Sequence, residues 1–505
     1  MTSTQDNVMF DQALSDYTSE FAEKPFLHKE FQYVIDNNGS DDYSRNQLIF
    51  ETISISNNGK FADYKNGFIS IPMVAVMSRS DEHQTATEGA NGLKFKNSNL
   101  VHIDSMAVEY GNDPVIQQRQ NFSAYCIFKQ HTELSLNDVE INGPTIGYRK
   151  DSNEWDFNDV TGVENNTTDL VSPFTYYSPQ QQKLMSNANV RRSGVNYYEK
   201  VGDEHVYYYD CIIRLKDLLF FDKMPSLLRG ANIKLTLILN QSETVVKVAA
   251  GVKTHVTNTL RGSINPILRT NEDIIAGKTF NETMSCKVVK NGAHSHVKNQ
   301  CRLYVPTYIL SPTFEEQYLN LGQKKIIYED IFTNNVIVKA NDNFQILLTN
   351  TLSRMKRLVI VPMIDKSANG STLNAPQESI YASEPCTTSP TFIRDFNVAL
   401  SGTNLYSNNI QYKYESFLNE LNGNFGVNSN LETGVCSSLI SMEDYNNNYG
   451  YIVVDLSRRY NFDEKTPLSV EIKGFNEGAK QLQFMCFITY TKEMTVNLNT
   501  GARIE

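Results

Sequence analysis

Two histidines, His294 and His296, stand one residue apart in the sequence GAHSHVKN. On a β-strand this spacing places both imidazoles on one face, where they could hold a metal ion together with a third ligand. No carboxylate or third ligand accompanies the pair, and the surrounding stretch lacks strand alternation. We therefore interpret the two histidines as an exposed loop pair and predict no metal-binding residue.

Adjacent carboxylates occur at Glu315–Glu316 and at Glu329–Asp330. Paired carboxylates are the catalytic groups of glycoside hydrolysis, which needs the two groups on either side of one bond. Neighbouring residues on a strand point to opposite faces, so Glu329 and Asp330 should diverge. We interpret both pairs as solvated surface residues.

Motifs for other chemistries are missing from the sequence. The segment AAGVKT at 249–254 lacks the leading glycine of a phosphate-binding loop, and neither GxSxG nor HExxH occurs. We assign no catalytic, cofactor-binding or metal-binding residue, expect no cofactor, and predict that the protein is not an enzyme.

The charge balance argues against direct nucleic-acid binding. The chain has 46 Lys and Arg against 57 Asp and Glu, a formal net charge of −11. Phosphate neutralisation requires clustered Lys or Arg, and the only such cluster, Arg354, Lys356 and Arg357, is short. We interpret it as a solvated sheet face. The first thirty residues are acidic, with the carboxylates Asp6, Asp11, Asp16, Glu20, Glu23 and Glu30.

Cysteine usage indicates a reducing compartment. The seven cysteines are odd in number, widely spread and free of CxxC pairs, so a disulfide framework is not expected. Several lie among apolar residues, where a free cysteine behaves as a small hydrophobe. We expect no signal peptide, and no apolar run approaches the ~18 residues that a transmembrane segment needs.

Apolar and polar residues alternate along much of the chain after residue 45, which is the period of half-buried strands. The alternation is present at 234–240 and 468–474. It is longest at 481–499, where one parity holds Leu482, Phe484, Cys486, Ile488, Tyr490, Met494, Val496 and Leu498. Many strands without regular helical crossovers predict an antiparallel all-β protein.

Three segments predict helices. Residues 311–319 carry Pro312 at the first helical position, with Ser311 as the cap, and 414–423 closes on Gly423. Residues 7–23 place Phe10, Leu14, Tyr17 and Phe21 three or four positions apart, which is an amphipathic stripe. This last helix could dock on its own domain or reach a neighbouring subunit, and the sequence does not decide between the two.

A chain of 505 residues predicts two domains. Strand alternation is lost at 255–300, and each half closes on similar strands, so we interpret the chain as two copies of one β-fold. We predict an N-terminal arm at 1–44, a first domain at 45–283 and a second at 284–505.

Several segments, taken in order, resemble the major capsid proteins of polinton-like viruses and virophages. In the second half these are CRLYVPTYILSPTFEEQYLN at 301–320, KKIIYEDIF at 324–332, SEPCTTSP at 383–390, DFNVALSGTNLY at 395–406, YESFLNELNG at 414–423, YIVVDLSRR at 451–459 and KEMTVNLNTG at 492–501. In the first half they are RNQLIFETISISNNGKFADYKNGFISIPMVAV at 45–76, HIDSMAVEYGN at 102–112 and CIIRLKDLLFFDKMPSLLRGANIKL at 211–235.

The resemblance implies a double jelly roll, two tandem eight-stranded antiparallel sandwiches with a few short helices. It implies a major capsid protein that forms homotrimeric, pseudo-hexagonal capsomers and tiles the icosahedral shell of a DNA virus. Its partners would be itself, neighbouring capsomers, a single jelly-roll vertex (penton) protein and cement proteins. It would reside in the virion and assemble inside the host cell.

Within this fold, residues 68–76 read as an early buried strand of the first jelly roll. Pro72 lacks a backbone donor, so we expect it at an edge, a bulge or the strand end, with no ladder hydrogen bond across it. The long loops 142–200, which includes Trp155, and 365–395 are expected on the outer surface or between capsomers.

Two other functions remain open at this point. One is a carbohydrate-binding or carbohydrate-active β-sandwich, which would show a concave aromatic cleft with paired carboxylates. The other is a minor vertex or spike protein of the same virion.

Overall fold

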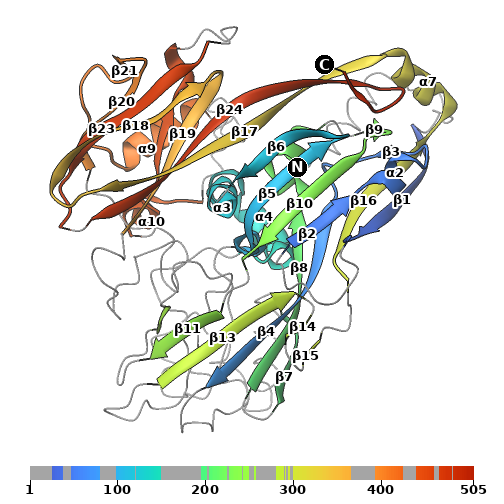
Figure 1. Cartoon of the computed structure of the whole chain (residues 1–505), viewed down its shortest axis with the longest axis horizontal. Coiled ribbons are helices and arrows are strands. Elements are labelled where there is room, and N and C mark those ends of the chain that lie inside the picture. The colour runs from blue at the N-terminus through green and yellow to red at the C-terminus, as the bar shows by residue number, and fades with distance from the viewer. Residues whose placement is uncertain are drawn as a thin grey trace.

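The computed structural model describes residues 25–37, 47–79, 98–119, 121–148, 195–201, 204–224, 227–240, 243–248, 255–257, 280–288, 290–291, 294–295, 300–364, 393–424, 439–447, 449–459, 466–479 and 481–504. Its strands form two groups that lie side by side (Figure 1). Two long strands, β17 (Gln323–Val338) and β24 (Leu482–Asn497), run from the second group across to the first. All strand pairs among the described residues are antiparallel, as the alternation predicts.

The first group contains a ten-stranded and a four-stranded sheet. The larger has the order β12-β11-β13-β4-β16-β3-β9, with β8 and β7 added beside β4 and β1 beside β16, and the smaller has the order β2-β10-β5-β6. The strands are β1 (Phe26–Ile35), β2 (Gln47–Glu51), β3 (Phe61–Ala62), β4 (Phe68–Arg79), β5 (Ile103–Tyr110), β6 (Asp113–Arg119), β7 (Val195–Val201), β8 (Glu204–Arg214), β9 (Leu228–Arg229), β10 (Ile233–Leu239), β11 (Glu243–Val248), β12 (His255–Thr257), β13 (Phe280–Val288) and β16 (Arg302–Leu310), with β14 (Lys290–Asn291) and β15 (His294–Ser295) as a separate pair.

The second group contains a five-stranded and a four-stranded sheet. The first has the order β17-β24-β19-β22, with β25 beside β24, and the second has the order β18-β23-β20-β21. Phe344 of β18 packs edge-on against Phe484 of β24, ring centroids 5.8 Å apart, so the two sheets face each other as a sandwich. The remaining strands are β18 (Asp342–Leu352), β19 (Met355–Ile364), β20 (Ile393–Leu400), β21 (Thr403–Asn404), β22 (Ile452–Asp455), β23 (Leu468–Asn476) and β25 (Arg503–Ile504).

The predicted alternation matches the observed burial. In β10, Ile233, Leu235, Leu237 and Leu239 are buried, and the residues between them are half-buried. All eight apolar residues of one parity between 482 and 498 are buried. Met485 and Phe487 of the other parity are buried too, because the middle of β24 is covered on both faces.

Pro72 lies in the interior of β4 and is in register with Asp210 of β8. The expectation that it stands at an edge, a bulge or a strand end is therefore wrong. On its other side β4 changes partner: Ser70 is the last residue paired with β16, and Met73 is the first paired with β13. A missing donor costs least at such a change of partner, because no continuous ladder passes the proline on that side.

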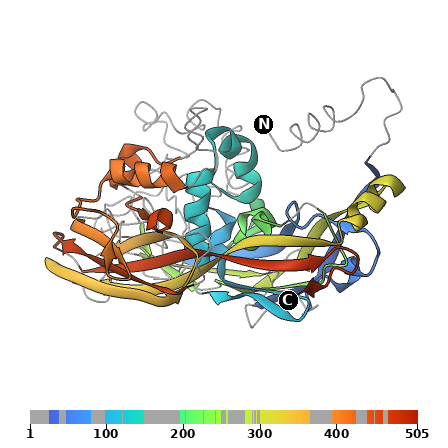
Figure 2. The same ribbon diagram turned by 90° about the horizontal axis from the view of Figure 1, so that it is seen from above.

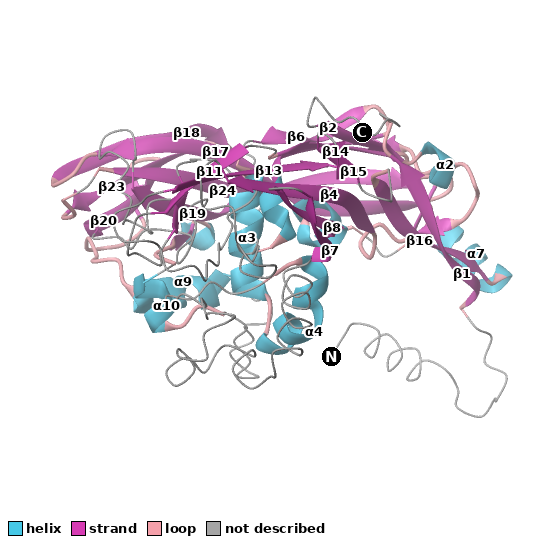
Figure 3. Cartoon of the chain, turned by 90° about the horizontal axis from the view of Figure 1, so that it is seen from below, coloured by secondary structure: helices cyan, strands magenta, loops and turns pink. Residues whose placement is uncertain are grey.

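Most of the helices gather on one side of the sheets (Figures 2 and 3), whereas α2 (Ile53–Ser56) and α7 (Pro312–Asn320) lie at the end of the first group that is remote from the second (Figure 1). Two confirm predictions: α7 (Pro312–Asn320) begins at the predicted proline, although the Ser311 side chain makes no cap bond, and α9 (Tyr414–Asn424) follows the second predicted segment. The short ones are α2 (Ile53–Ser56), α6 (Leu219–Asp222), α10 (Met442–Asn447), η1 (Asn99–His102), η4 (Leu215–Asp217) and η5 (Ser457–Arg459). The predicted helix at 7–23 lies outside the described residues.

Two further helices, α3 (Phe122–Glu133) and α4 (Leu136–Ile146), were not predicted. Ser135 and Asp138 form a capping box at the start of α4, and Gly147, with φ of 64°, ends it. The first residues of the predicted loop 142–200 are therefore the last turn of a helix. Residues 149–194, with Trp155, and 365–392 lie outside the described part of the chain.

Strand pairing crosses both predicted boundaries, the one after residue 44 and the one after residue 283. β1 belongs to the predicted arm at 1–44, yet it pairs along its length with β16. β16 lies beyond residue 284 but pairs with β4 in the sheet of the first half. The domain boundary at residues 283 and 284 stays a prediction. The last strand of the first group of sheets ends at Leu310, and the first strand of the second group begins at Gln323.

The C-terminal end of the chain returns to the first sandwich. Tyr110 of β5 donates a hydrogen bond of 2.8 Å to the carbonyl oxygen of Gly501. A Cβ atom on Gly501 would lie 2.2 Å from the backbone carbon of Gly230, and Gly501 has φ of +71°. The two backbones thus approach more closely than any other residue type allows.

We predict that Gly501→Ala lowers the free energy of unfolding by about 1–3 kcal/mol more than Gly322→Ala. Both glycines have positive φ, but a Cβ atom on Gly322 meets nothing within 4 Å. Urea unfolding of the two variants measures the difference. Equal losses would mean that this backbone contact is not formed in solution.

Candidate functional site

Helix α3 lies between the two sandwiches, and its residues from Phe122 to Thr132 are all buried. On the second sandwich, Tyr125 packs against Phe487 and Phe128 packs edge-on against Tyr451, with ring centroids 5.8 and 5.0 Å apart. The His131 Nδ1 atom is 3.1 Å from the Tyr451 hydroxyl. We call the contact of α3 with β19, with β24 and with Tyr451, the residue before β22, the joint.

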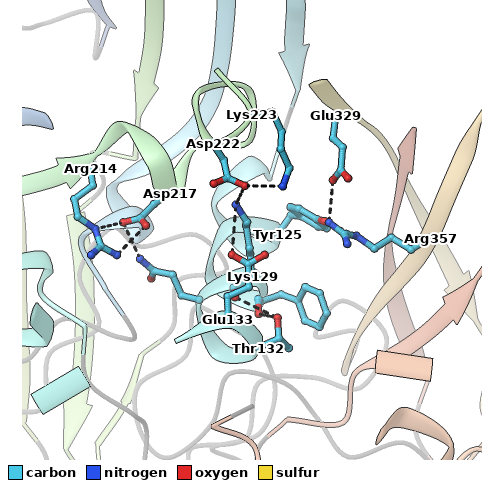
Figure 4. Close-up of polar contacts among 12 residues, drawn as sticks. Tyr125, Lys129, Thr132, Glu133, Arg214, Asp217, Asp222, Lys223, Glu329 and Arg357 are labelled. Carbon is cyan, nitrogen blue, oxygen red and sulfur yellow. Dashed lines mark hydrogen bonds and ion pairs between the residues drawn. The ribbon is translucent and has the colours of Figure 1, made fainter. Parts of the chain in front are cut away.

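A buried arginine connects α3 to the second sandwich (Figure 4). Arg357 of β19 donates from Nη2 to the Glu329 carboxylate of β17 at 2.9 Å and from Nε to the Tyr125 hydroxyl at 3.0 Å. Lys356 donates to the other Glu329 oxygen at 2.7 Å. The Arg357 and Glu329 side chains are 7% and 8% exposed. Burial alone would raise the pKa of Glu329, but the charges of Arg357 and Lys356 outweigh it and hold that pKa below its usual value.

A second buried cation ties α3 to its own sandwich. Lys129 lies 3.1 Å from an Asp222 carboxylate oxygen and 3.5 Å from a Glu133 oxygen. Burial would raise the pKa of Asp222, but the Lys129 charge lowers it overall. At Glu133 burial dominates and raises the pKa. The charges at the joint are thus paired, which buried ions require.

Asp330, next to Glu329, points to the opposite face of β17. It accepts hydrogen bonds of 2.7 Å from the Tyr490 hydroxyl and from Lys492. The predicted divergence of Glu329 and Asp330 is therefore confirmed, but the prediction that they are solvated is wrong. Both side chains are buried, 8% and 1% exposed, because each has cationic or hydroxyl donors within the fold.

The prediction of a solvated sheet face for the basic cluster at residues 354–357 is also wrong. Arg357 is buried at the joint, and Arg354 pairs with Glu493 at 3.0 Å. Only Lys356 keeps a third of its side chain exposed. A solvated face was expected because three cations in four residues resemble a surface strand, whereas their carboxylate partners lie far away in the sequence.

The remaining candidate residues lie on other elements of the chain. His294 is buried on β15, 2.7 Å from Glu204, so the expected exposed loop position is wrong for it, and His296 lies outside the described residues. Glu315 is half-buried and pairs with Arg229 at 2.7 Å, while Glu316 is exposed. Cys126, Cys211, Cys301 and Cys486 are buried, as predicted for small hydrophobes.

The described part of the chain holds no group of three or more His, Cys, Asp or Glu side chains that could bind a metal ion. It also contains no helix both long and apolar enough to cross a membrane. The carboxylates of the joint are already paired with cations. Chemically, the arrangement fastens two sandwiches together.

No protein-family model matches the sequence, and no curated protein matches it. Solved structures do match. A chain of the Sputnik virophage, from a 3.5 Å cryo-EM structure, has a TM-score of 0.54 at 10% identity over 97% of this chain and 90% of that chain. The mavirus major capsid protein has a TM-score of 0.52 at 9% identity over 97% of this chain and 92% of that one. These likenesses establish the fold: the chain is a double jelly roll, as predicted.

We predict that Arg357→Met lowers the free energy of unfolding by about 3–5 kcal/mol, because Glu329 is left as a buried charge with one half-buried partner, Lys356. The double variant Arg357→Met/Glu329→Gln should recover part of this loss. Lys325→Met is the matched control, since it removes an exposed cation, 2.8 Å from Glu493, and should cost at most about 1 kcal/mol. Denaturant unfolding that gives similar losses for the Arg357 and Lys325 variants would contradict a buried ionic joint.

Proposed function

We propose that the chain is a major capsid protein that self-assembles into trimeric, pseudo-hexagonal capsomers of an icosahedral viral shell. The observation that carries this proposal is the whole-chain match to virophage structures, which includes both sandwiches. A partial match to one sandwich would fit many unrelated β-proteins.

The geometry is consistent with a building block. Each chain holds two sandwiches side by side. Three such chains arranged around one axis would place six sandwiches in a ring with a hexagonal outline. Exposed apolar side chains of the kind that subunit contacts bury are available on both halves. They include Ile53, Leu136, Ile141, Leu321, Ile327, Ile337, Leu347 and Met442.

The proposed capsid role also implies where the protein resides and which proteins lie next to it. The protein would reside in the virion after assembly in the host cell, next to a single jelly-roll vertex protein and cement proteins. With a net charge of −11, the chain itself would not neutralise the genome, which other proteins would hold. Each of the two domains, with the boundary predicted at residues 283 and 284, would contribute one jelly roll to the capsomer.

The other two candidate functions have weaker support. Glu329 and Asp330 face away from each other and are held by cations, so they do not form the carboxylate pair of a carbohydrate-active sandwich. A vertex or spike role would suit a single jelly roll better than this double one. The number of copies per particle separates a major shell protein from a vertex protein.

The native mass of the purified chain, measured by light scattering, tests self-assembly. We expect about 172 kDa, three times the chain mass of 57.3 kDa, and hexagonal outlines on imaging the same sample. A species of 57.3 kDa at all concentrations would contradict self-trimerisation of the chain.

A further inference from the structure

The edge of the larger first sheet presents an exposed row of aromatic rings. β1 pairs only with β16 among the described strands, and its residues Phe31 and Tyr33 are 56% and 51% exposed. Phe31 lies against Phe68 of β4, Tyr33 lies against Tyr304 of β16, and Phe68 stacks on Tyr304 with ring centroids 4.9 Å apart. We call these four residues the aromatic strip. Phenyl rings this exposed on a soluble chain indicate a docking surface.

The strip leads directly into a basic pocket of about 350 Å³. Phe68 and Ile212 contribute apolar surface to it, and Lys65, Arg214 and Lys216 contribute cations. Arg214 is neutralised by Asp217, with contacts of 2.9 and 2.8 Å. Lys65 and Lys216 have no ion-pair partner among the described residues. The pocket therefore suits a group that is apolar on one side and anionic on the other.

The N-terminal segment of this same chain has that character. Residues 7–23 combine the stripe Phe10, Leu14, Tyr17 and Phe21 with an acidic remainder. Between residues 1 and 24 the only cation is Lys24, against the five carboxylates Asp6, Asp11, Asp16, Glu20 and Glu23. Its apolar stripe matches the aromatic strip, and its carboxylates match the two lysines that lack a partner.

The segment also has the right length and the right starting point. Pro25 is held in place because its carbonyl oxygen accepts a hydrogen bond of 3.1 Å from the Ser311 backbone. A proline there disfavours helix at Lys24, so a helix over 7–23 would end where the chain must turn. Phe68, the strip residue that lines the pocket, is level with Tyr304 and, through it, with Tyr33 of β1. From Phe26 to Tyr33, β1 covers about 24 Å, and a helix of seventeen residues is about 25 Å long. A segment that turned back at Lys24 and Pro25 would thus bring its first residues level with Phe68.

We propose that the amphipathic segment 7–23 docks on the aromatic strip and basic pocket of its own first sandwich. The sequence leaves two possibilities for this segment, docking on its own domain or reaching a neighbouring subunit, and the proposal selects the first. The contact covers an edge strand and exposed rings that would otherwise promote unspecific association. It does not depend on the proposed capsid function, since it is made within one chain.

A photo-cross-linker tests this contact in the full-length chain. We would replace Phe10 with benzoylphenylalanine, refold ¹⁴N- and ¹⁵N-labelled chains together so that any oligomer contains both labels, irradiate the mixture, and map the products by mass spectrometry. The proposal predicts cross-links to peptides containing Phe31, Phe68 or Lys216, with both partners carrying the same isotope. Mixed-isotope products would show that a neighbouring copy supplies the segment, and cross-links elsewhere would show that it docks on another surface; either result overturns the proposal.

Charge reversal provides the matched comparison. Lys65→Glu/Lys216→Glu should lower the cross-link yield about tenfold, which corresponds to the loss of two ion pairs. Lys339→Glu/Lys413→Glu changes the net charge equally at exposed positions of the second sandwich and should leave the yield unchanged. Equal yields from the two double variants would rule out the basic pocket as the docking site, and circular dichroism would verify that both remain folded.

Discussion

The buried contact of Arg357 with Glu329 and Tyr125 is the constraint on which the arrangement of the two halves depends. Taking an arginine and a glutamate out of water is costly, and the cost is recovered only when both keep good hydrogen-bond partners. Here those partners come from three elements: β19, β17 and helix α3. The contact therefore forms only when α3 of the first half is seated on the second sandwich. Apolar packing would tolerate other orientations, but the hydrogen bond from Arg357 to the Tyr125 hydroxyl requires a particular one.

Covalent continuity supports the same arrangement. β17 and β24 are both sixteen residues long, and their ends extend beyond the second sandwich toward the first. There Tyr328 packs edge-on against Phe220, with ring centroids 5.2 Å apart. The chain then returns at Gly501 to lie against Tyr110 and Gly230. Two sandwiches joined only by a flexible linker would not keep a fixed orientation. Two sandwiches held by these contacts would present one surface to neighbouring copies, which suits the proposed role in a shell.

Features that follow from a local sequence pattern, such as strand alternation and the start of a helix, could be predicted from the sequence. The strand at 481–499 follows from a period of two residues and the helix at 312 from a proline at its first position, and both are present. Helix α3 was missed because it is buried all round, so its sequence FSAYCIFKQHTE shows no amphipathic stripe. Arg357, Glu329, Asp330 and His294 were placed on the surface because charge usually indicates solvent. Their partners are tens or hundreds of residues away, and only tertiary structure brings them together.

Scanning calorimetry tests most directly whether the joint makes one body of two sandwiches. If the account is correct, the chain melts in a single cooperative transition, with equal calorimetric and van't Hoff enthalpies. Arg357→Met should then separate that transition into two, because each sandwich would unfold with less dependence on the other. Two independent transitions in the unmodified chain would contradict the account, since they would show that the halves are stable separately and that the joint couples them weakly.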